Sequence, residues 1–490
     1  MELDSLLGEN EQIKLRLLRY VQTKTGFITF DDIFLTIAIS ELRLKKIITE
    51  INEELQSIDS RVYIFFKKKM VWKKLDDMTI KKLRLSYFNK NPTFLLFKAY
   101  LEENISVQQF KNRIFLSTPT IYVKHKKVKE FLQKYGLTIR KGNIVGEELH
   151  VRNTIYLIFY EIFYGIENPF SITVRSKLNK LMNYLISLFQ LKLRETEKIK
   201  FEIFLGIFLC RLEHNNYLNK NHDFFKLNLG EIKQLINNFR KSIFFKNTSI
   251  LNEQIIIEIK YLLGFIKMLG VDNIPICMKE EKFKKIDYIS QQITMQFVNI
   301  FQYKEAERKL SASLENEIKQ INREGLVFEN IFCCFKLNRY EKKIVDLYPM
   351  YSQCIRYVLS NYKGKILGIL DQVRLDYLFY RYLFLLIDLV PFKYYFEPIY
   401  ICIDFSLGKN YTKFIQKQFE HLQDLNIVVE QYLSSQTNIF ISDIEFSNKS
   451  VKQIIWDKPF ILDDWQLFIN KLTKLVQEKK LLKLKFLDCE

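Results

Sequence analysis

Residues 115–150 read FLSTPTIYVKHKKVKEFLQKYGLTIRKGNIVGEELH, and this stretch decides how the N-terminal third of the chain folds. Ser117 and Pro119 favour the start of a helix, because a serine side chain caps free backbone N–H groups and proline in a first turn gives up no hydrogen bond. Gly136 predicts the end of that helix, since glycine readily adopts the left-handed conformation that follows many last turns. Lys141-Gly142 then predicts the tight turn of a β-hairpin.

Two shorter helices are predicted ahead of this one, over 91–103 and 106–115, from apolar residues spaced for burial on one side. Three helices followed by a hairpin are typical of the winged helix-turn-helix, whose third helix enters the DNA major groove while the wing touches phosphates. We therefore predict such a domain over residues 89–165.

The third helix of this unit has an exposed side that mixes hydroxyls, small apolar groups and lysines. Such a mixture suits contact with base edges, thymine methyl groups and phosphates. A run of charge on a helix is usually only a solvated face, but here it lies on the third helix of the series and precedes a basic wing. His125 projects toward the rim of the buried stripe, where we expect it to pack. The side chains that we expect to contact DNA are Thr118, Thr120, Tyr122, Val123, Lys126, Lys127, Lys134, Arg140 and Lys141.

A unit of the same order is predicted over residues 1–88. Two helical stripes precede a third helix that Ser40 can cap, and RVYIFFKKKMVWKKL at 61–75 follows as two strands around a lysine-rich turn. The pattern also fits a plain three-helix bundle with a solvated charged face, and Glu50 and Glu53 weaken the case for close DNA contact. If the unit binds DNA, the expected contacts are Arg43, Lys46, Thr49, Lys67, Lys68 and Lys69.

Positive charge is concentrated in the same two units. The net charge of the chain is +19. Residues 61–90 hold ten Lys and Arg against two Asp, and residues 111–141 hold nine against one Glu, so each segment carries a net +8. Focused charge of this kind implies a polyanionic partner, which is nucleic acid or, less readily, an anionic membrane.

The sequence lacks the motifs of the common enzyme classes. It has no glycine-rich phosphate loop, no H-E-x-x-H and no G-x-S-x-G, so we expect no catalysis, cofactor or metal. The seven cysteines include no C-x-x-C pair, which favours free thiols in a reducing cytoplasm. No run of ~20 uninterrupted apolar residues occurs. We therefore expect a soluble, cytoplasmic protein without a membrane partner.

The stretch from 115 to 165 resembles the second helix-turn-helix of the Mga and AtxA family of Gram-positive transcriptional regulators. In that family, two N-terminal helix-turn-helix domains precede two helical phosphotransferase-system regulation domains (PRD domains) and a C-terminal domain like an enzyme IIB component (EIIB). The resemblance follows the whole chain in order and length, but its motifs are sharp only over these fifty or so residues. It implies control of virulence or carbohydrate-metabolism genes, and homodimerisation through the regulation and C-terminal domains.

The middle of the chain has the helical periodicity that two regulation domains need, and we place them at 166–282 and 283–395. No sequence repeat relates the two blocks, so a tandem pair rests on the resemblance. The helices predicted there span 176–193, 197–211, 229–239, 252–268, 286–301, 311–323 and 372–389.

In the regulation domains of this family, a histidine accepts phosphate from the sugar phosphotransferase system, which makes its phosphocarrier protein a further partner. The first block of this chain offers two candidates, His214 and His222, and no histidine occurs between 223 and 420. His214 follows a helix that carries Arg211 and is the better candidate. An ordinary histidine at a helix end stays the alternative.

The C-terminal part, 396–490, alternates strands with helices, which predicts a small α/β domain with a parallel sheet. The resemblance makes this the EIIB-like domain. Its first loop, 404–409, has no cysteine at the place where active enzyme IIB components are phosphorylated, and Cys402 lies too early. We therefore expect this domain to bind or dimerise. The predicted strands span 399–405, 426–432 and 438–444, and the predicted helices span 411–422 and 463–479.

These patterns predict a mainly α, multidomain, DNA-binding transcriptional regulator. Two alternatives stay open. One is an RNA-binding antiterminator with the same regulation domains, although such proteins begin with a small β-rich domain. The other is a non-specific architectural DNA-binding protein, which the charge alone does not exclude.

Overall fold

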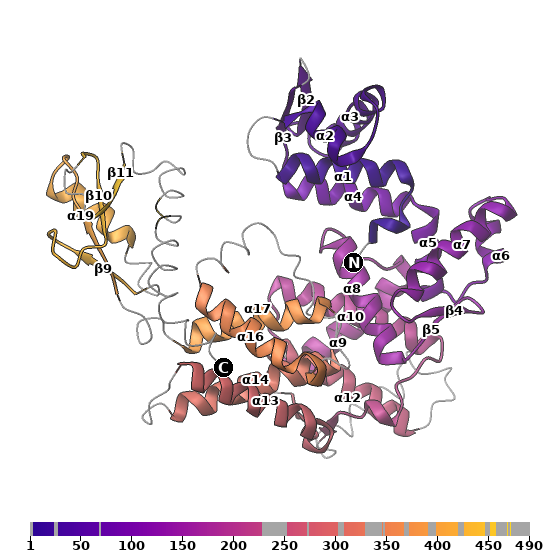
Figure 1. Ribbon diagram of the computed structural model, residues 1–490. Helices are drawn as coiled ribbons and strands as arrows, with labels where there is room; N and C mark the ends of the chain where they lie inside the picture. The colour runs from indigo at the N-terminus through magenta and orange to yellow at the C-terminus, as the bar shows by residue number, and fades with distance from the viewer. Residues whose placement is uncertain are drawn as a thin grey trace. The chain divides into compact units, whose positions relative to one another are not determined.

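The structure is a computed structural model (Figure 1). The chain divides into two compact units, Met1–Lys282 with Val327–Cys334, and Phe283–Leu326 with Phe335–Glu490. The residues that the structure describes are 3–23, 28–67, 70–227, 252–271, 274–301, 308–328, 345, 348–366, 372–390, 398–419, 426–445, 451–456, 468 and 471.

The first part of the chain folds as a winged helix. Its third helix begins as predicted, because the Ser40 hydroxyl accepts a hydrogen bond from the Arg43 backbone N–H (3.4 Å). The hairpin is completed by a short first strand into a three-stranded antiparallel sheet in the order β1-β3-β2, which favours the winged fold over a plain three-helix bundle. The elements are α1 (Glu9–Thr23), β1 (Ile28–Thr29), α2 (Phe30–Ile37), α3 (Glu41–Gln56), β2 (Tyr63–Lys67) and β3 (Met70–Lys74).

A second winged helix follows, and its third helix and wing match the local signals. The Ser117 hydroxyl accepts from the Thr120 N–H (3.4 Å), and Gly136 has a φ of +68° just beyond the helix. Lys141 (φ +48°) and Gly142 (φ +80°) form the turn of the wing, and both positive angles are what a type I′ hairpin turn requires. The elements are α4 (Asp77–Lys90), α5 (Pro92–Glu102), α6 (Val107–Arg113), α7 (Thr118–Gln133), β4 (Thr138–Arg140), β5 (Asn143–Val145) and α8 (Glu148–Phe163).

Helix α8 also belongs to the helical block behind the wing. All but three of its sixteen residues are buried, whereas a surface helix buries a single stripe. The block has an aromatic core in which the rings of Phe204 and Phe265 stack with centroids 3.8 Å apart. The helix predicted over 229–239 lies outside the described residues. The elements of the block are α9 (Ile172–Phe189), α10 (Glu195–Glu213), η2 (Lys220–His222), β6 (Phe225–Leu227), α12 (Asn252–Met268) and β7 (Ile276–Met278).

The second compact unit contains another helical block. A buried chain of hydrogen bonds joins three of its helices: the Tyr382 hydroxyl donates to Asn322 Oδ1 (2.6 Å), and Asn322 Nδ2 donates to Ser290 Oγ (2.9 Å). Helix α16 is not among the helices predicted from the sequence. The elements are α13 (Glu280–Phe301), α14 (Arg308–Val327), α16 (Pro349–Ile366) and α17 (Gln372–Leu389).

The C-terminal part is a small parallel sheet in the strand order β11-β10-β8-β9. This sheet and the predominance of helix confirm the predicted fold class. The fourth strand is an addition to the three predicted, and the segment predicted as a helix over 463–479 lies outside the described residues apart from 468 and 471. The elements are β8 (Ile399–Ile403), α19 (Lys409–Phe419), β9 (Ile427–Glu430), β10 (Ile439–Ser442) and β11 (Lys452–Ile455).

The five domain boundaries drawn from the sequence stay predictions. Among the described helices, none combines the length and apolar character that crossing a bilayer requires.

Candidate nucleic-acid interface

Helix α7 has one buried side and one exposed side. Ile121, Val128 and Leu132 are fully buried against the rest of the winged unit. On the other side, Tyr122 is 54% exposed and Val123 is 62% exposed. The exposed side also includes Thr118, Thr120 and Lys126. A face that offers hydroxyls, apolar groups and a cation together can contact base edges and phosphates at once.

Lys127 departs from the prediction. It is half-buried, and its Nζ donates a hydrogen bond to the backbone carbonyl of Leu7 (2.7 Å). Burial, with the charge of Lys124 nearby, lowers the pKa of Lys127. The helical wheel places this side chain outside, but the N-terminal turn η1 (Leu3–Leu6) packs against α7 and covers it. Lys127 therefore contacts protein in this structure.

His125 packs, as expected. Its Nδ1 lies 2.7 Å from the Tyr100 hydroxyl, and the two rings meet edge to face. Burial, with Lys129 nearby, lowers the pKa of His125, so the ring is neutral at neutral pH. This side chain holds α5 against α7.

The end of α7 and the wing present the other predicted contacts. Lys134 is the exposed C-cap residue of α7. Arg140 and Lys141 are exposed on either side of the β4–β5 turn. Gly142 is required there, since a Cβ at this position would lie 2.4 Å from the Ile105 carbonyl oxygen. These cations are placed beside α7, where a wing meets phosphates.

The wing is held from behind by two buried arginines. The Arg211 guanidinium donates to Asn143 Oδ1 and to the Ile144 carbonyl oxygen (both 3.0 Å), and also to the Glu148 carboxylate (3.0 and 2.6 Å). Arg152 donates to Glu148 (2.7 Å) and to both oxygens of Glu258 on α12 (2.7 and 2.9 Å). This cluster, which we call the arginine junction (Glu148, Arg152, Arg211 and Glu258), joins β5 to α8, α10 and α12.

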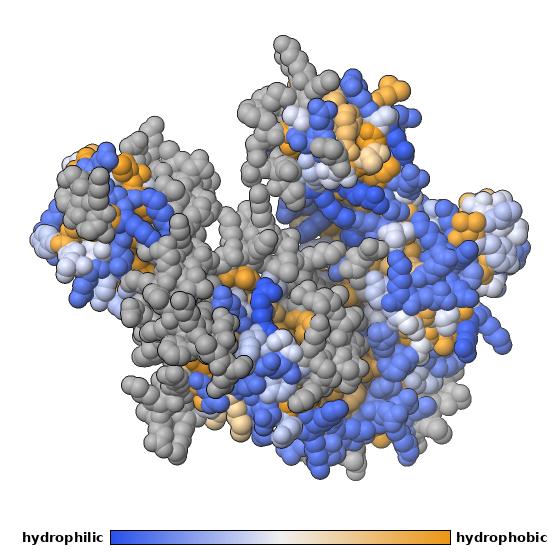
Figure 2. Space-filling model, in the orientation of Figure 1, coloured by the Kyte–Doolittle hydropathy of each residue, from blue (hydrophilic) through white to orange (hydrophobic). Residues whose placement is uncertain are grey.

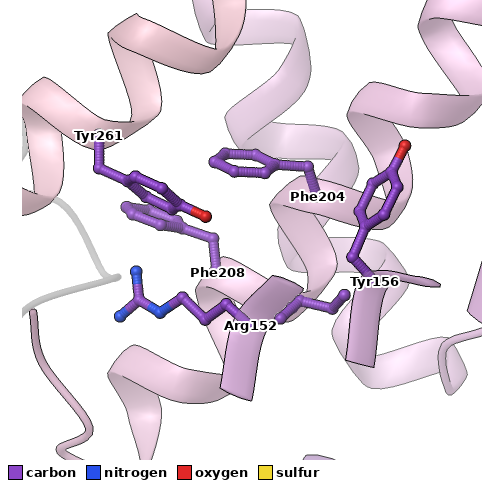
Figure 3. A pocket seen from close by; sticks show the side chains of 6 residues that line it. Arg152, Tyr156, Phe204, Phe208 and Tyr261 are labelled. Carbon is purple, nitrogen blue, oxygen red and sulfur yellow. The ribbon is translucent and has the colours of Figure 1, made fainter. Parts of the chain in front are cut away.

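Aromatic rings close the arginine junction on one side. The Arg152 guanidinium carbon lies 5.7 Å from the ring centre of Phe208 and 5.6 Å from that of Tyr261 (Figure 3). The cavity that these rings line with Tyr156 and Phe204 has a volume of about 10 Å³, which is no larger than one water molecule needs. It is therefore packing space and too small for an organic ligand.

In the first winged unit, Arg43, Lys46 and Thr49 are exposed on α3. Arg43 lies 3.6 Å from Glu9, a weak pair that leaves its guanidinium accessible. Glu50 is part-exposed, and its carboxylate pairs with Lys14 of α1 (2.9 Å). Of the predicted wing lysines, Lys67 is the last residue of β2 and its side chain is not described, and Lys68 and Lys69 lie outside the described residues.

The two candidate phosphohistidines have different surroundings. His222 is buried: its Nε2 pairs with the Glu147 carboxylate, and its Nδ1 accepts the Asn219 backbone N–H (3.2 Å). Both of its ring nitrogens are therefore engaged. His214 is the half-buried C-cap residue of α10, and its Nε2 has no hydrogen-bond partner among the described residues.

Sequence reasoning missed Phe115, which lies at the turn before α7 with 92% of its side chain exposed. It also missed α4 and the arginine junction. A signal for Phe115 was present, since a phenylalanine between Arg113 and the cap Ser117 is an unusual turn residue.

Comparison with curated proteins gives no match. One protein-family model does match: residues 76–160 are similar to the Mga helix-turn-helix domain. The match begins at Asp76, the N-cap of α4, and ends within α8, so it includes one helix more than the domain predicted from residue 89. The chain thus contains, over residues 76–160, a helix-turn-helix of the Mga type, a domain of DNA-binding transcriptional regulators.

Proposed function

We propose that this protein is a sequence-preferring regulator of transcription that binds double-stranded promoter DNA mainly through its second winged helix. Helix α7 enters the major groove, and the β4–β5 wing lies on the phosphate backbone. The observation that carries this proposal is the exposed face of α7, from Thr118 to Lys126, within the segment that matches the Mga helix-turn-helix domain.

The first winged helix adds a weaker contact. Its helix α3 carries three cations against four acids, whereas α7 carries four lysines against one glutamate. Lys14 pairs with both Glu50 and Glu54 and offsets one of their two charges, while Arg43 and Lys46 are exposed and can face DNA. We therefore assign affinity to both units and base recognition chiefly to the second.

We also propose three properties that the family resemblance implies. They are homodimerisation through the regulation and C-terminal domains, control of virulence or carbohydrate-metabolism genes, and phosphorylation of His214 by the phosphocarrier protein. His214 is preferred to His222 because its Nε2 makes no hydrogen bond within the described part of the chain, whereas Nε2 of His222 pairs with Glu147. A phosphate would add about −1.5 to −2 charge beside α10, which also carries Arg211.

The test is binding of the full chain to the region upstream of its own gene, measured by fluorescence anisotropy against a random duplex of equal length and an RNA hairpin. A preference for the promoter duplex supports the proposal. Equal affinity for both duplexes favours an architectural protein, and preference for the RNA favours an antiterminator.

Phosphorylation has its own test in a reporter assay. His214→Asp should change transcription and dimerisation, whereas His214→Gln serves as the uncharged control. If the Asp variant leaves both unchanged, the phosphorylation part of the proposal fails.

A further inference from the structure

The two helix-turn-helix turns share one backbone conformation. Ala38 and Phe115 each have a φ of +53°, and each lies two residues before the serine that caps the third helix, Ser40 or Ser117. This left-handed conformation is unfavourable for any residue with a Cβ and rare for a bulky one. The residue at this position is a small alanine in the first winged helix and a phenylalanine in the second.

The fold buries almost none of Phe115. Its side chain is 92% exposed, the highest value among the large hydrophobic side chains that the structure describes. The ring therefore stands in water on a strained backbone, and both conditions disfavour the folded state. A contact outside the chain accounts for such a residue.

The surroundings of Phe115 fit a DNA groove. It lies two residues before Ser117, the N-cap of α7, and the exposed Thr118 and Thr120 follow in the first turn of that helix. Lys111 Nζ donates to the Thr118 hydroxyl (3.2 Å), which places a cation beside the same turn. In Figure 2, orange hydrophobic atoms lie beside pale ones, of intermediate hydropathy, on the lobe that holds α6 and α7 in Figure 1. A protein partner would cover an apolar patch, whereas an aromatic ring set among cations and hydroxyls suits the edge of a charged duplex.

We propose that Phe115 packs against a thymine methyl group at the edge of the major groove and so specifies thymine at one position of each half-site. This inference rests on the proposed function, because it requires α7 to lie in the groove. Apolar contact with the thymine methyl is one of the ways in which a side chain distinguishes thymine from the other bases.

The experiment replaces each thymine in turn by deoxyuridine, which lacks only the methyl group. The probe is a 30-base-pair duplex selected from a random pool with the full wild-type chain. For the wild type, one position in each half-site should lose about fourfold in affinity, the value expected for one buried methyl group. For Phe115→Ala, that position should become insensitive to the exchange, while other positions keep their wild-type pattern.

A second variant separates this role from a structural one. Phe115→Gly removes the ring and suits the positive φ, so it should raise the Tm of the chain while it weakens DNA binding. The matched control, Ala38→Gly, changes the equivalent residue of the first unit, and it should raise the Tm without altering the deoxyuridine pattern.

The outcomes are distinct. If the wild type binds the duplex but Phe115→Ala keeps the full methyl dependence, the inference fails and the proposed function stands. If the wild type selects no duplex, both fail. If Phe115→Ala leaves the pattern unchanged but shifts the oligomeric state in size-exclusion chromatography, the ring contacts a second copy of the chain, which also overturns the inference.

Discussion

Replacing Arg211 by methionine should release the wing of the second winged helix. Arg211 is 1% exposed, and it holds Asn143, Ile144 and Glu148 together. Breaking a buried ion pair by removing one partner costs about 3–5 kcal/mol. Glu148 keeps Arg152 as a partner (2.7 Å), which reduces that cost, but the Ile144 carbonyl oxygen loses its side-chain donor, which adds about 1–3 kcal/mol.

These magnitudes predict that the free energy required to open the β4–β5 hairpin locally falls by about 3–5 kcal/mol. Since every 1.4 kcal/mol is a factor of ten, amides of the hairpin should exchange with deuterium roughly 10² to 4 × 10³ times faster than in the wild type. Hydrogen exchange of the intact chain, followed by mass spectrometry of peptides over 137–147, measures this.

The matched control is Arg194→Met, the same change at the N-cap of the same helix α10, where the guanidinium is exposed and pairs with Glu197 three residues on. It should leave hairpin exchange at the wild-type rate. The reasoning is refuted if Arg211→Met speeds exchange in α10 alone, because Arg211 would then stabilise its own helix without holding the wing.

Three further predictions concern single side chains. Lys126→Ala should reduce the slope of log affinity against log salt concentration by about 0.9. Lys127→Ala should leave that slope unchanged and lower the Tm, because Lys127 donates to a backbone carbonyl. Equal changes in slope for the two variants would mean that both lysines contact DNA. Burial raises the pKa of Glu148, but the two arginines outweigh it and hold the pKa below the ordinary 4.5. Its stabilisation is therefore present above pH 4.5 and lost as the pH falls below it, so the Tm should drop between pH 4.5 and 3, with a smaller drop in Arg211→Met. Burial raises the pKa of Cys402 to about 11, so iodoacetamide at pH 8 should alkylate exposed Cys277 first; faster labelling of Cys402 in peptide mass spectra would contradict this.

The features that the sequence predicts well depend on neighbours within a few residues. Ser40 and Ser117 cap helices whose N–H groups lie three residues on, and Lys141-Gly142 determines its own turn. Helix boundaries in both winged units follow from such signals. Helix α4 was not predicted, because its buried residues lie on several sides of the helix and form no single apolar stripe.

The features that the sequence misses depend on distant partners. Lys127 looks exposed on a wheel, yet it meets the carbonyl of a residue 120 positions away. Arg152 and Glu258 are 106 positions apart and look like two ordinary surface charges until α8 and α12 are packed. No local pattern distinguishes a charge that will be buried in a pair from one that stays in water.

The arginine junction also limits how far the DNA-binding part can be separated from the rest. A chain cut after residue 165 keeps both winged helices but loses Arg211 and Glu258, the partners of Glu148 and Arg152. It also exposes α8, which is buried on nearly every side, and a helix of that kind does not hold its position without packing. The fragment 1–165 should therefore melt at a lower temperature than the full chain and bind the same duplex more weakly. Circular dichroism melting and anisotropy titration measure the two quantities; a fragment that matches the full chain in both would mean that the wing needs no support from the helices behind it.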